Sequence, residues 1–158
     1  MAVAIAGLAA SFLATSFVAM AQDQSAATAK DVILARKTLM NSIMDNMDRI
    51  GSMISLRKID LHAAQEHADN ISVMFMAFPH LFPPTSNQWK ENAKLDPATD
   101  TIASPDVWTD FADFYQRAAT AAQTAYEMSR APNEDEVKRL NRALGIACDT
   151  CHALYLKE

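Results

Sequence analysis

Residues 133–155 read NEDEVKRLNRALGIACDTCHALY, and this stretch carries the signals that decide the fold. Asn133 is a residue type that caps helix N-termini, and the three acidic residues after it suit the positive end of a helix dipole. Residues at apolar-stripe positions then recur at intervals of three and four. They are Val137, Leu140, Leu144, Cys151 and Tyr155, with Ala147 and Cys148 between them. The stretch therefore predicts an amphipathic helix with one face in a core.

Near the end of that helix, Cys148-Asp149-Thr150-Cys151-His152 forms a C-x-x-C-H motif, the pattern of covalent haem attachment. Cys148, Cys151 and His152 stand at i, i+3 and i+4, so both thiols and the imidazole project from one helix face. The two thiols can form thioethers with the vinyl groups of a haem, and His152 can ligate its iron as the proximal axial ligand. The motif predicts one covalently attached haem c.

Other chemistry fits this motif less well. A zinc site normally collects four Cys or His ligands, but these are the only two cysteines, and His62, His67 and His80 are scattered far upstream. We assign those histidines no role. A thioredoxin-like dithiol would follow a strand and open a helix, whereas this motif lies inside a helical pattern. A structural disulfide is a further alternative, but it gives no reason for His152.

The N-terminus indicates a compartment. Residues 1–21 contain no charged side chain and end in Ala19-Met20-Ala21, which predicts a cleaved secretory signal peptide. An uncleaved membrane anchor is the alternative, because the apolar run approaches the ~20 residues that span a bilayer. Bacteria attach haem c outside the cytoplasm. We therefore expect a cytochrome domain over residues 22–158, located in the periplasm.

The composition excludes several function classes. The formal net charge is -5, with no basic stripe, so nucleic acid is a poor partner. The three glycines form no phosphate-binding loop, and no nucleophile elbow occurs. Removing the first 21 of 158 residues leaves 137, enough for one domain with a real core but not for two. The sequence offers no enzyme signature.

Proline positions and apolar periodicity predict four helices. All six prolines fall between residues 79 and 132. Helical patterns cover about 30–54 and 60–78, a third helix follows a Ser104 cap, and the fourth begins after Asn133. The first stripe comprises Ile33, Arg36, Met40, Ile43, Met47, Ile50 and Ile54. We expect an all-α, antiparallel four-helix bundle that holds the haem inside.

The third helix and the connection before it carry further signals. Pro105 and Asp106 suit the first turn of the helix. The long connection from Pro79 to Ser104 should pack over one end of the bundle. Trp108 either lines the haem or fills the core, and core filling is the preferred interpretation.

With C-x-x-C-H on the last helix of a small exported bundle, the chain resembles the class II c-type cytochromes, the cytochrome c′ family. The resemblance covers essentially the whole of residues 22–158. Besides the haem motif it includes, in order, Arg36-x-x-x-Met40, Phe78-Pro79-His80-Leu81-Phe82-Pro83 and Val107-Trp108. The C-terminal motif is specific for haem, whereas each of the others is weak alone.

The resemblance implies ligands for the haem. In low-spin members a methionine supplies the sixth iron ligand, and the matching position here is Met40, with Met47 as the second candidate. The matching arginine, Arg36, is placed in the family to pair with a haem propionate. One position departs from the family pattern. Members often carry a basic residue four positions after the haem histidine, but Leu156 stands there.

The resemblance also implies a function. A methionine-ligated haem suits a periplasmic single-electron carrier, not an enzyme; the alternative is a five-coordinate or labile-ligand haem that binds NO or CO. Partners would be unidentified redox proteins, with basic docking faces suggested by the acidic balance. The membrane is a partner only if the N-terminal segment stays uncleaved. Family members are monomers or homodimers, and we expect one of these states.

Overall fold

The computed structural model describes residues 14–96 and 99–157, with side chains from residue 29 onward. The predicted signal peptide, residues 1–21, lies mostly outside the described part, so its cleavage stays a prediction. Among the described residues, none of the helices combines the length and apolar character needed to cross a bilayer.

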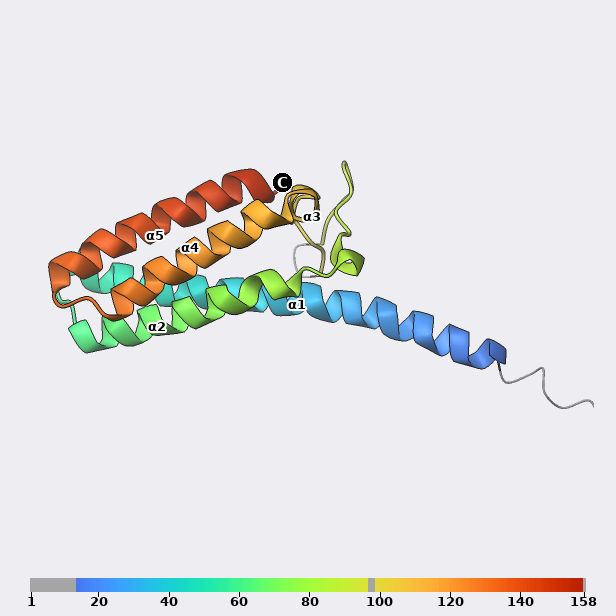
Figure 1. The fold of residues 1–158 in the computed structure, drawn as a ribbon, viewed down its shortest axis with the longest axis horizontal. Coiled ribbons are helices and arrows are strands. Elements are labelled where there is room, and N and C mark those ends of the chain that lie inside the picture. The colour runs from blue at the N-terminus through green and yellow to red at the C-terminus, as the bar shows by residue number, and fades with distance from the viewer. Residues whose placement is uncertain (1–13, 97–98, 158) are drawn as a thin grey trace, which may run out of the picture.

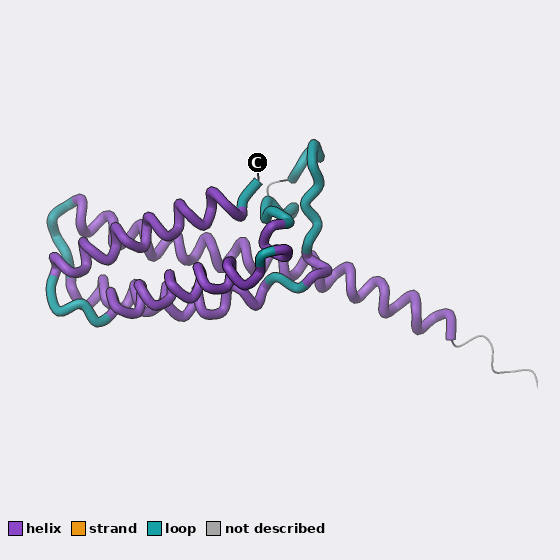
Figure 2. The backbone as a smooth tube through the Cα atoms, turned by 45° about the horizontal axis from the view of Figure 1, so that its top comes forward, coloured by secondary structure: helices purple, strands orange, loops and turns teal. Residues whose placement is uncertain are grey.

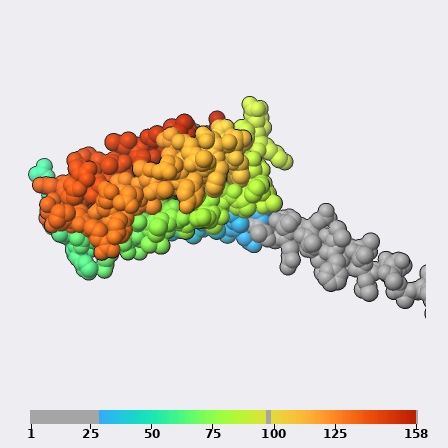
Figure 3. All heavy atoms as spheres, in the orientation of Figure 1, coloured from blue at the N-terminus to red at the C-terminus, as the bar shows by residue number. Residues whose placement is uncertain are grey.

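Four long helices, α1, α2, α4 and α5, form an antiparallel bundle (Figures 1 and 2). The elements, in chain order, are α1 Ala14–Ser55, α2 Leu61–Ala77, the short 3-10 helices η1 Phe78–Leu81 and η2 Pro84–Ser86, α3 Asp106–Thr109, α4 Phe111–Ser129 and α5 Glu134–Tyr155. Helix α2 packs between α1 and α4, and α4 packs beside α5. Figure 3 shows the filled face on which α4 lies between α2 and α5. The all-α four-helix prediction is confirmed.

Capping residues mark the starts of two helices. The Asn133 side chain accepts a hydrogen bond from the Glu136 amide at 3.0 Å, as its position before α5 predicts. Asp60 accepts likewise from the Ala63 amide at 3.1 Å, before α2. Each cap satisfies an amide that has no partner within the helix.

The third predicted helix is divided in two. The Ser104 hydroxyl oxygen accepts from the Asp106 amide at 3.1 Å, but α3 ends at Thr109, and Asp110 (φ -124°, ψ 48°) separates it from α4. Tertiary contacts favour the break. Trp108 packs back on the preceding connection, and its indole Nε1 donates to the carbonyl of Phe82 at 3.0 Å.

The bundle interior has two clusters of buried side chains, one toward each end. The aliphatic cluster comprises Ile43, Ile50, Ala64, Ala68, Ile71, Phe75, Ala121, Ala122, Ala125, Met128, Ala131, Val137, Leu140 and Leu144. The aromatic cluster comprises Phe78, Phe82, Ala103, Val107, Phe114 and Tyr155. Their buried apolar surface is the main source of stability in a bundle of this kind.

The connection between η1 and α3 packs over the aromatic end, as predicted. The Ser104 amide donates to the Tyr155 carbonyl at 2.8 Å, and the Lys157 amide donates to the Ile102 carbonyl at 2.9 Å. From the other side, Lys37 Nζ donates to the Asp100 carbonyl at 2.8 Å. These bonds tie the connection to both α1 and the end of α5.

Candidate haem-binding site

A hollow lies at the aromatic end of the bundle. Its larger part has a volume of about 260 Å³ and its narrower part about 30 Å³. The two parts share walls formed by Met40, Phe78, Phe114, Cys151 and His152. The hollow is therefore bounded by α1, η1, α4 and α5, with sulfur and imidazole groups among mostly apolar side chains.

The two cysteines of the C-x-x-C-H motif face this hollow from α5. Cys148 lines the narrow part and Cys151 lines both parts. Both thiols are free, so the structure has no disulfide between Cys148 and Cys151. Burial, with a smaller effect from nearby negative charges, raises the pKa of Cys148 to about 11, and burial also raises the pKa of Cys151. In the haem-free chain both are thus neutral thiols at pH 7.

His152 follows on the same helix and lines both parts of the hollow. The last turn of α5 is intact around it, because the Leu156 amide donates to the His152 carbonyl at 3.0 Å. The i, i+3, i+4 spacing thus brings both sulfurs and the imidazole to one cavity, as the helical pattern predicts.

Met40 and Met47 lie in different surroundings on α1. Met40 lines both parts of the hollow and packs against the aromatic cluster. Met47 packs against the aliphatic cluster. The structure therefore brings Met40, not Met47, to the cavity that His152 lines from α5.

Arg36 lies one turn before Met40 and is only 4% exposed. Its guanidinium donates to the Ser86 hydroxyl at 3.0 Å, to the Ser86 carbonyl at 3.3 Å and to the Thr101 hydroxyl. It also lies 4.7 Å from the Phe82 ring centroid. Burial lowers its pKa to about 10, so the group stays charged at neutral pH. These contacts offset the cost of burying the charge.

The partners of Arg36 were missed from the sequence. Ser86 and Thr101 lie 50 and 65 residues after Arg36, and no periodic signal joins them to it. Arg36 also borders the larger part of the hollow, where a carboxylate of a bound group could reach it. Its pairing with a haem propionate stays a prediction.

Other wall residues were only partly foreseen. Tyr155 belongs to the apolar stripe predicted for residues 133–155, and its ring packs edge to face on Phe114 at 5.3 Å between centroids. Arg117 was not singled out, although Asp113 four residues earlier gives the helix-pair spacing that could have revealed it. Trp108 is half-buried against the aromatic cluster and is absent from the described residues that line the hollow, which favours core filling.

The residues around the hollow fit a covalently attached haem. Two thiols and an imidazole come from one helix, a thioether comes from another, and the remaining walls are largely aromatic or aliphatic. Neutral imidazole and thioether are established axial ligands of haem iron. Apolar walls within a helical bundle also exclude water from such a group.

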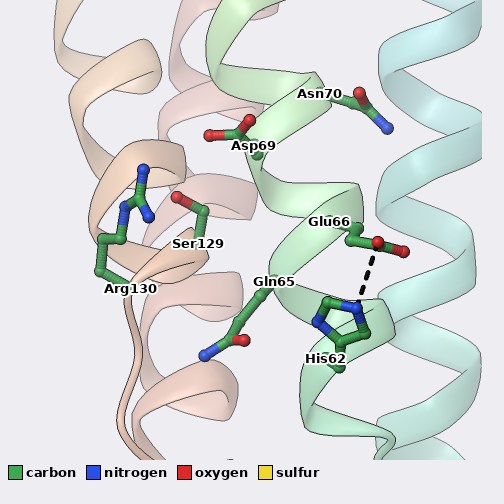
Figure 4. Close-up of a pocket in the computed structure, with 7 residues that line it drawn as sticks. All are labelled: His62, Gln65, Glu66, Asp69, Asn70, Ser129 and Arg130. Carbon is green, nitrogen blue, oxygen red and sulfur yellow. Dashed lines mark ion pairs between the residues drawn. The ribbon is translucent and has the colours of Figure 1, made fainter.

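A second, more open hollow of about 430 Å³ lies at the other end of the bundle (Figure 4). Side chains of α2 form one wall, and Ser129 and Arg130 at the end of α4 form the other. His62 there contacts Glu66 at 3.3 Å, and its side chain is exposed. Across the described residues, no three His, Cys, Asp or Glu side chains are grouped to hold a metal ion. This hollow has no thiol and does not compete as the haem site.

Comparisons with known proteins show the family to which the chain belongs. Residues 31–155 match the model of the family described as Cytochrome C′. Cytochrome c-554 of Cereibacter sphaeroides is 28% identical over 158 residues, covering 98% of this chain and 97% of that protein. Cytochrome c-556 of Agrobacterium tumefaciens is 28% identical over 123 residues, covering 76% of this chain and 92% of that protein.

The fold is shared with solved structures. Cytochrome c prime from Shewanella frigidimarina superposes with a TM-score of 0.69 at 22% identity, covering 82% of this chain and 97% of that chain. At this identity the superposition bears on the fold alone.

Proposed function

Since this chain belongs to the cytochrome c′ family and is a monohaem, electron-carrying c-type cytochrome, we propose that it holds its haem iron between His152 and Met40 as a six-coordinate, single-electron carrier of the periplasm. In this proposal Cys148 and Cys151 bind the haem c as thioethers, and Arg36 faces a propionate. The haem, when bound, supplies one-electron iron redox chemistry. The role is electron carriage, not catalysis.

The observation that carries the proposal is the pairing of Met40 and His152 on one hollow. Met40 comes from α1 and His152 from α5, and both line each part of the cavity. With a haem bound, a thioether and an imidazole as its two protein ligands would give the iron a higher potential than two imidazoles and would leave no open position for a gas. The surrounding aromatic side chains exclude water and hold both ligands in place.

Arg36 has a second task in this proposal. Its guanidinium holds Ser86 and Thr101 of the connection against α1, next to the larger part of the hollow. A positive charge here would favour a propionate and keep the connection closed over the cavity. Replacing Arg36 should therefore loosen the connection and also weaken the binding of the haem propionate.

The location and partners are also proposals. The uncharged segment at residues 1–21 supports export to the periplasm, where redox partners would exchange electrons with the haem. A cytochrome c′ of the same fold is described as having a ligand-controlled dimer dissociation. For this chain we propose a monomer or homodimer.

Replacing Met40 by Leu tests the ligand assignment. The two side chains have similar volume, so the fold should persist. We expect Met40→Leu to convert the ferric spectrum from low spin to high spin, to remove the methionine-to-iron band and to lower the potential. Met47→Leu is the matched control on the same helix and should leave the spectrum unchanged.

An unchanged spectrum in Met40→Leu would contradict the assignment. If the wild-type ferrous protein also bound carbon monoxide readily, the alternative of a five-coordinate or labile-ligand haem that takes up NO or CO would replace the carrier.

A further inference from the structure

Arg117 places a positive charge in the wall of the haem hollow. It lines the narrow part of the cavity together with Cys148, Cys151 and His152. Of the described residues that line this part, Arg117 is the only arginine or lysine. The walls beside it on α4 are Phe114, Ala118 and Ala121.

The guanidinium is held in position by two residues. Its Nε donates to Asp113 Oδ2 at 2.5 Å, and the Tyr155 hydroxyl donates to the same oxygen at 2.6 Å. Asp113 lies four residues before Arg117 on α4, whereas Tyr155 lies three residues after His152 on α5. The three side chains therefore join α4 to the last turn of the haem-binding helix.

Tyr155 takes part in this arrangement from a buried position. It is 5% exposed and packs edge to face on Phe114. Asp113 and Arg117 are about one-third exposed, so each is accessible to water on one side only. The pair thus lies at the border between the hollow and the solvent.

The charged pair lies close to the haem-attachment residues. Arg117 lines the narrow part of the hollow together with Cys148, Cys151 and His152. Asp113 is joined through the Tyr155 hydroxyl to the last turn of α5. A group bound at Cys151 would therefore have both charges in its neighbourhood.

We infer that Arg117 is a determinant of the haem reduction potential, and that Asp113 and Tyr155 are its positioning residues. Reduction adds one electron, delivered by a redox partner, to the ferric iron and lowers the charge of the haem compartment by one. A cation in the wall stabilises that product and raises the potential, while the paired Asp113 moderates the effect.

This inference needs the covalent haem at Cys151 but not the Met40 ligand. A high-spin spectrum in the wild-type protein would overturn the Met40 assignment and leave the role of Arg117 standing. Equally, unchanged potentials in the Arg117 variants would overturn the role of Arg117 and leave the Met40 assignment standing.

The test is the midpoint potential of haem-loaded variants, recorded with their absorbance spectra and thermal midpoints. Arg117→Gln should lower the potential, and Arg117→Lys should retain most of the wild-type value. The matched control is Arg139→Gln, because Arg139 pairs with Glu136 at 2.6 Å on the exposed surface of α5, away from the hollow. It should leave the potential unchanged.

Asp113→Asn distinguishes charge from packing. It removes the anion and leaves the guanidinium, so it should raise the potential, opposite to Arg117→Gln. A general loosening of the cluster would move both variants in the same direction. That result, or equal potentials for Arg117→Gln and Arg139→Gln, would overturn the inference.

Discussion

At the end of the bundle where α2 begins, aliphatic and small side chains close the core, whereas at the other end aromatic side chains surround a hollow of about 260 Å³. Ile50 in the aliphatic cluster is fully buried. Met40, three turns earlier on the same helix, borders the hollow. One helix thus serves as core at one end and as cofactor wall at the other. The aliphatic end is a packed core, whereas the aromatic end surrounds a cavity lined by thiol, imidazole and thioether groups.

The largest effect should come from removing the thiols at the aromatic end. The double substitution of Cys148 and Cys151 by Ser should abolish covalent haem, measured as haem retained on the denatured chain. Thr150→Ala is the control within the same motif, because its hydroxyl donates to the Ile146 carbonyl on an exposed turn. Haem that stays attached in the double variant would contradict the assignment.

The next comparison separates stability from haem environment. Ile50→Ala should lower the free energy of unfolding by about 2–5 kcal/mol through lost burial and a residual cavity, without changing the haem spectrum. Phe82→Leu, at the aromatic end, should shift the haem bands and the potential with a smaller loss of stability. Urea unfolding and absorbance measure both quantities. If Ile50→Ala changed the spectrum as much as Phe82→Leu, the two ends would not be independent.

A smaller effect should appear at high pH. Burial, followed by the hydrogen bond to Asp113, raises the pKa of Tyr155 to about 12. In the unfolded chain a tyrosine titrates near about 10. The native protein therefore holds a proton that the unfolded chain loses, so the stabilisation is full below about pH 10 and is lost as pH rises to about 12. Tyr155→Phe should show a shallower loss of stability across this range in urea titrations, and parallel curves would contradict the assignment.

The smallest effect belongs to the cap of α5, far from the hollow. Asn133→Ala should lower the free energy of unfolding by about 1 kcal/mol, because the Glu136 amide loses its acceptor. Asn133→Asp keeps an acceptor and should stay near wild type. Neither variant should alter the haem spectrum, and a spectral change would mean that the cap influences the aromatic end.

The contrast between the ends also explains what the sequence could predict. The aliphatic cluster follows helical periodicity, so residues such as Ile50 and Leu140 were placed correctly from spacing alone. The C-x-x-C-H motif is likewise local, and its three side chains meet the hollow as expected. Capping at Asn133 depends only on neighbouring residues, and it too was predictable.

The aromatic end depends on contacts between distant segments. Arg36 donates hydrogen bonds to Ser86 and Thr101, which no helical period connects to it. The helix break at Asp110 likewise has no signal in the apolar periodicity. The cluster of Asp113, Arg117 and Tyr155 needs the relative placement of α4 and α5. Such features follow from tertiary packing around the hollow, which a single sequence does not display.

The absorbance spectra of the ferric and ferrous haem-loaded protein, followed by addition of carbon monoxide to the ferrous form, test the central claim most directly. Saturation of the iron by His152 and Met40 predicts low-spin spectra, a ferric methionine-to-iron band and little response to carbon monoxide. High-spin spectra with ready carbon monoxide binding would contradict it and would make Met40 a packing residue of the cavity wall.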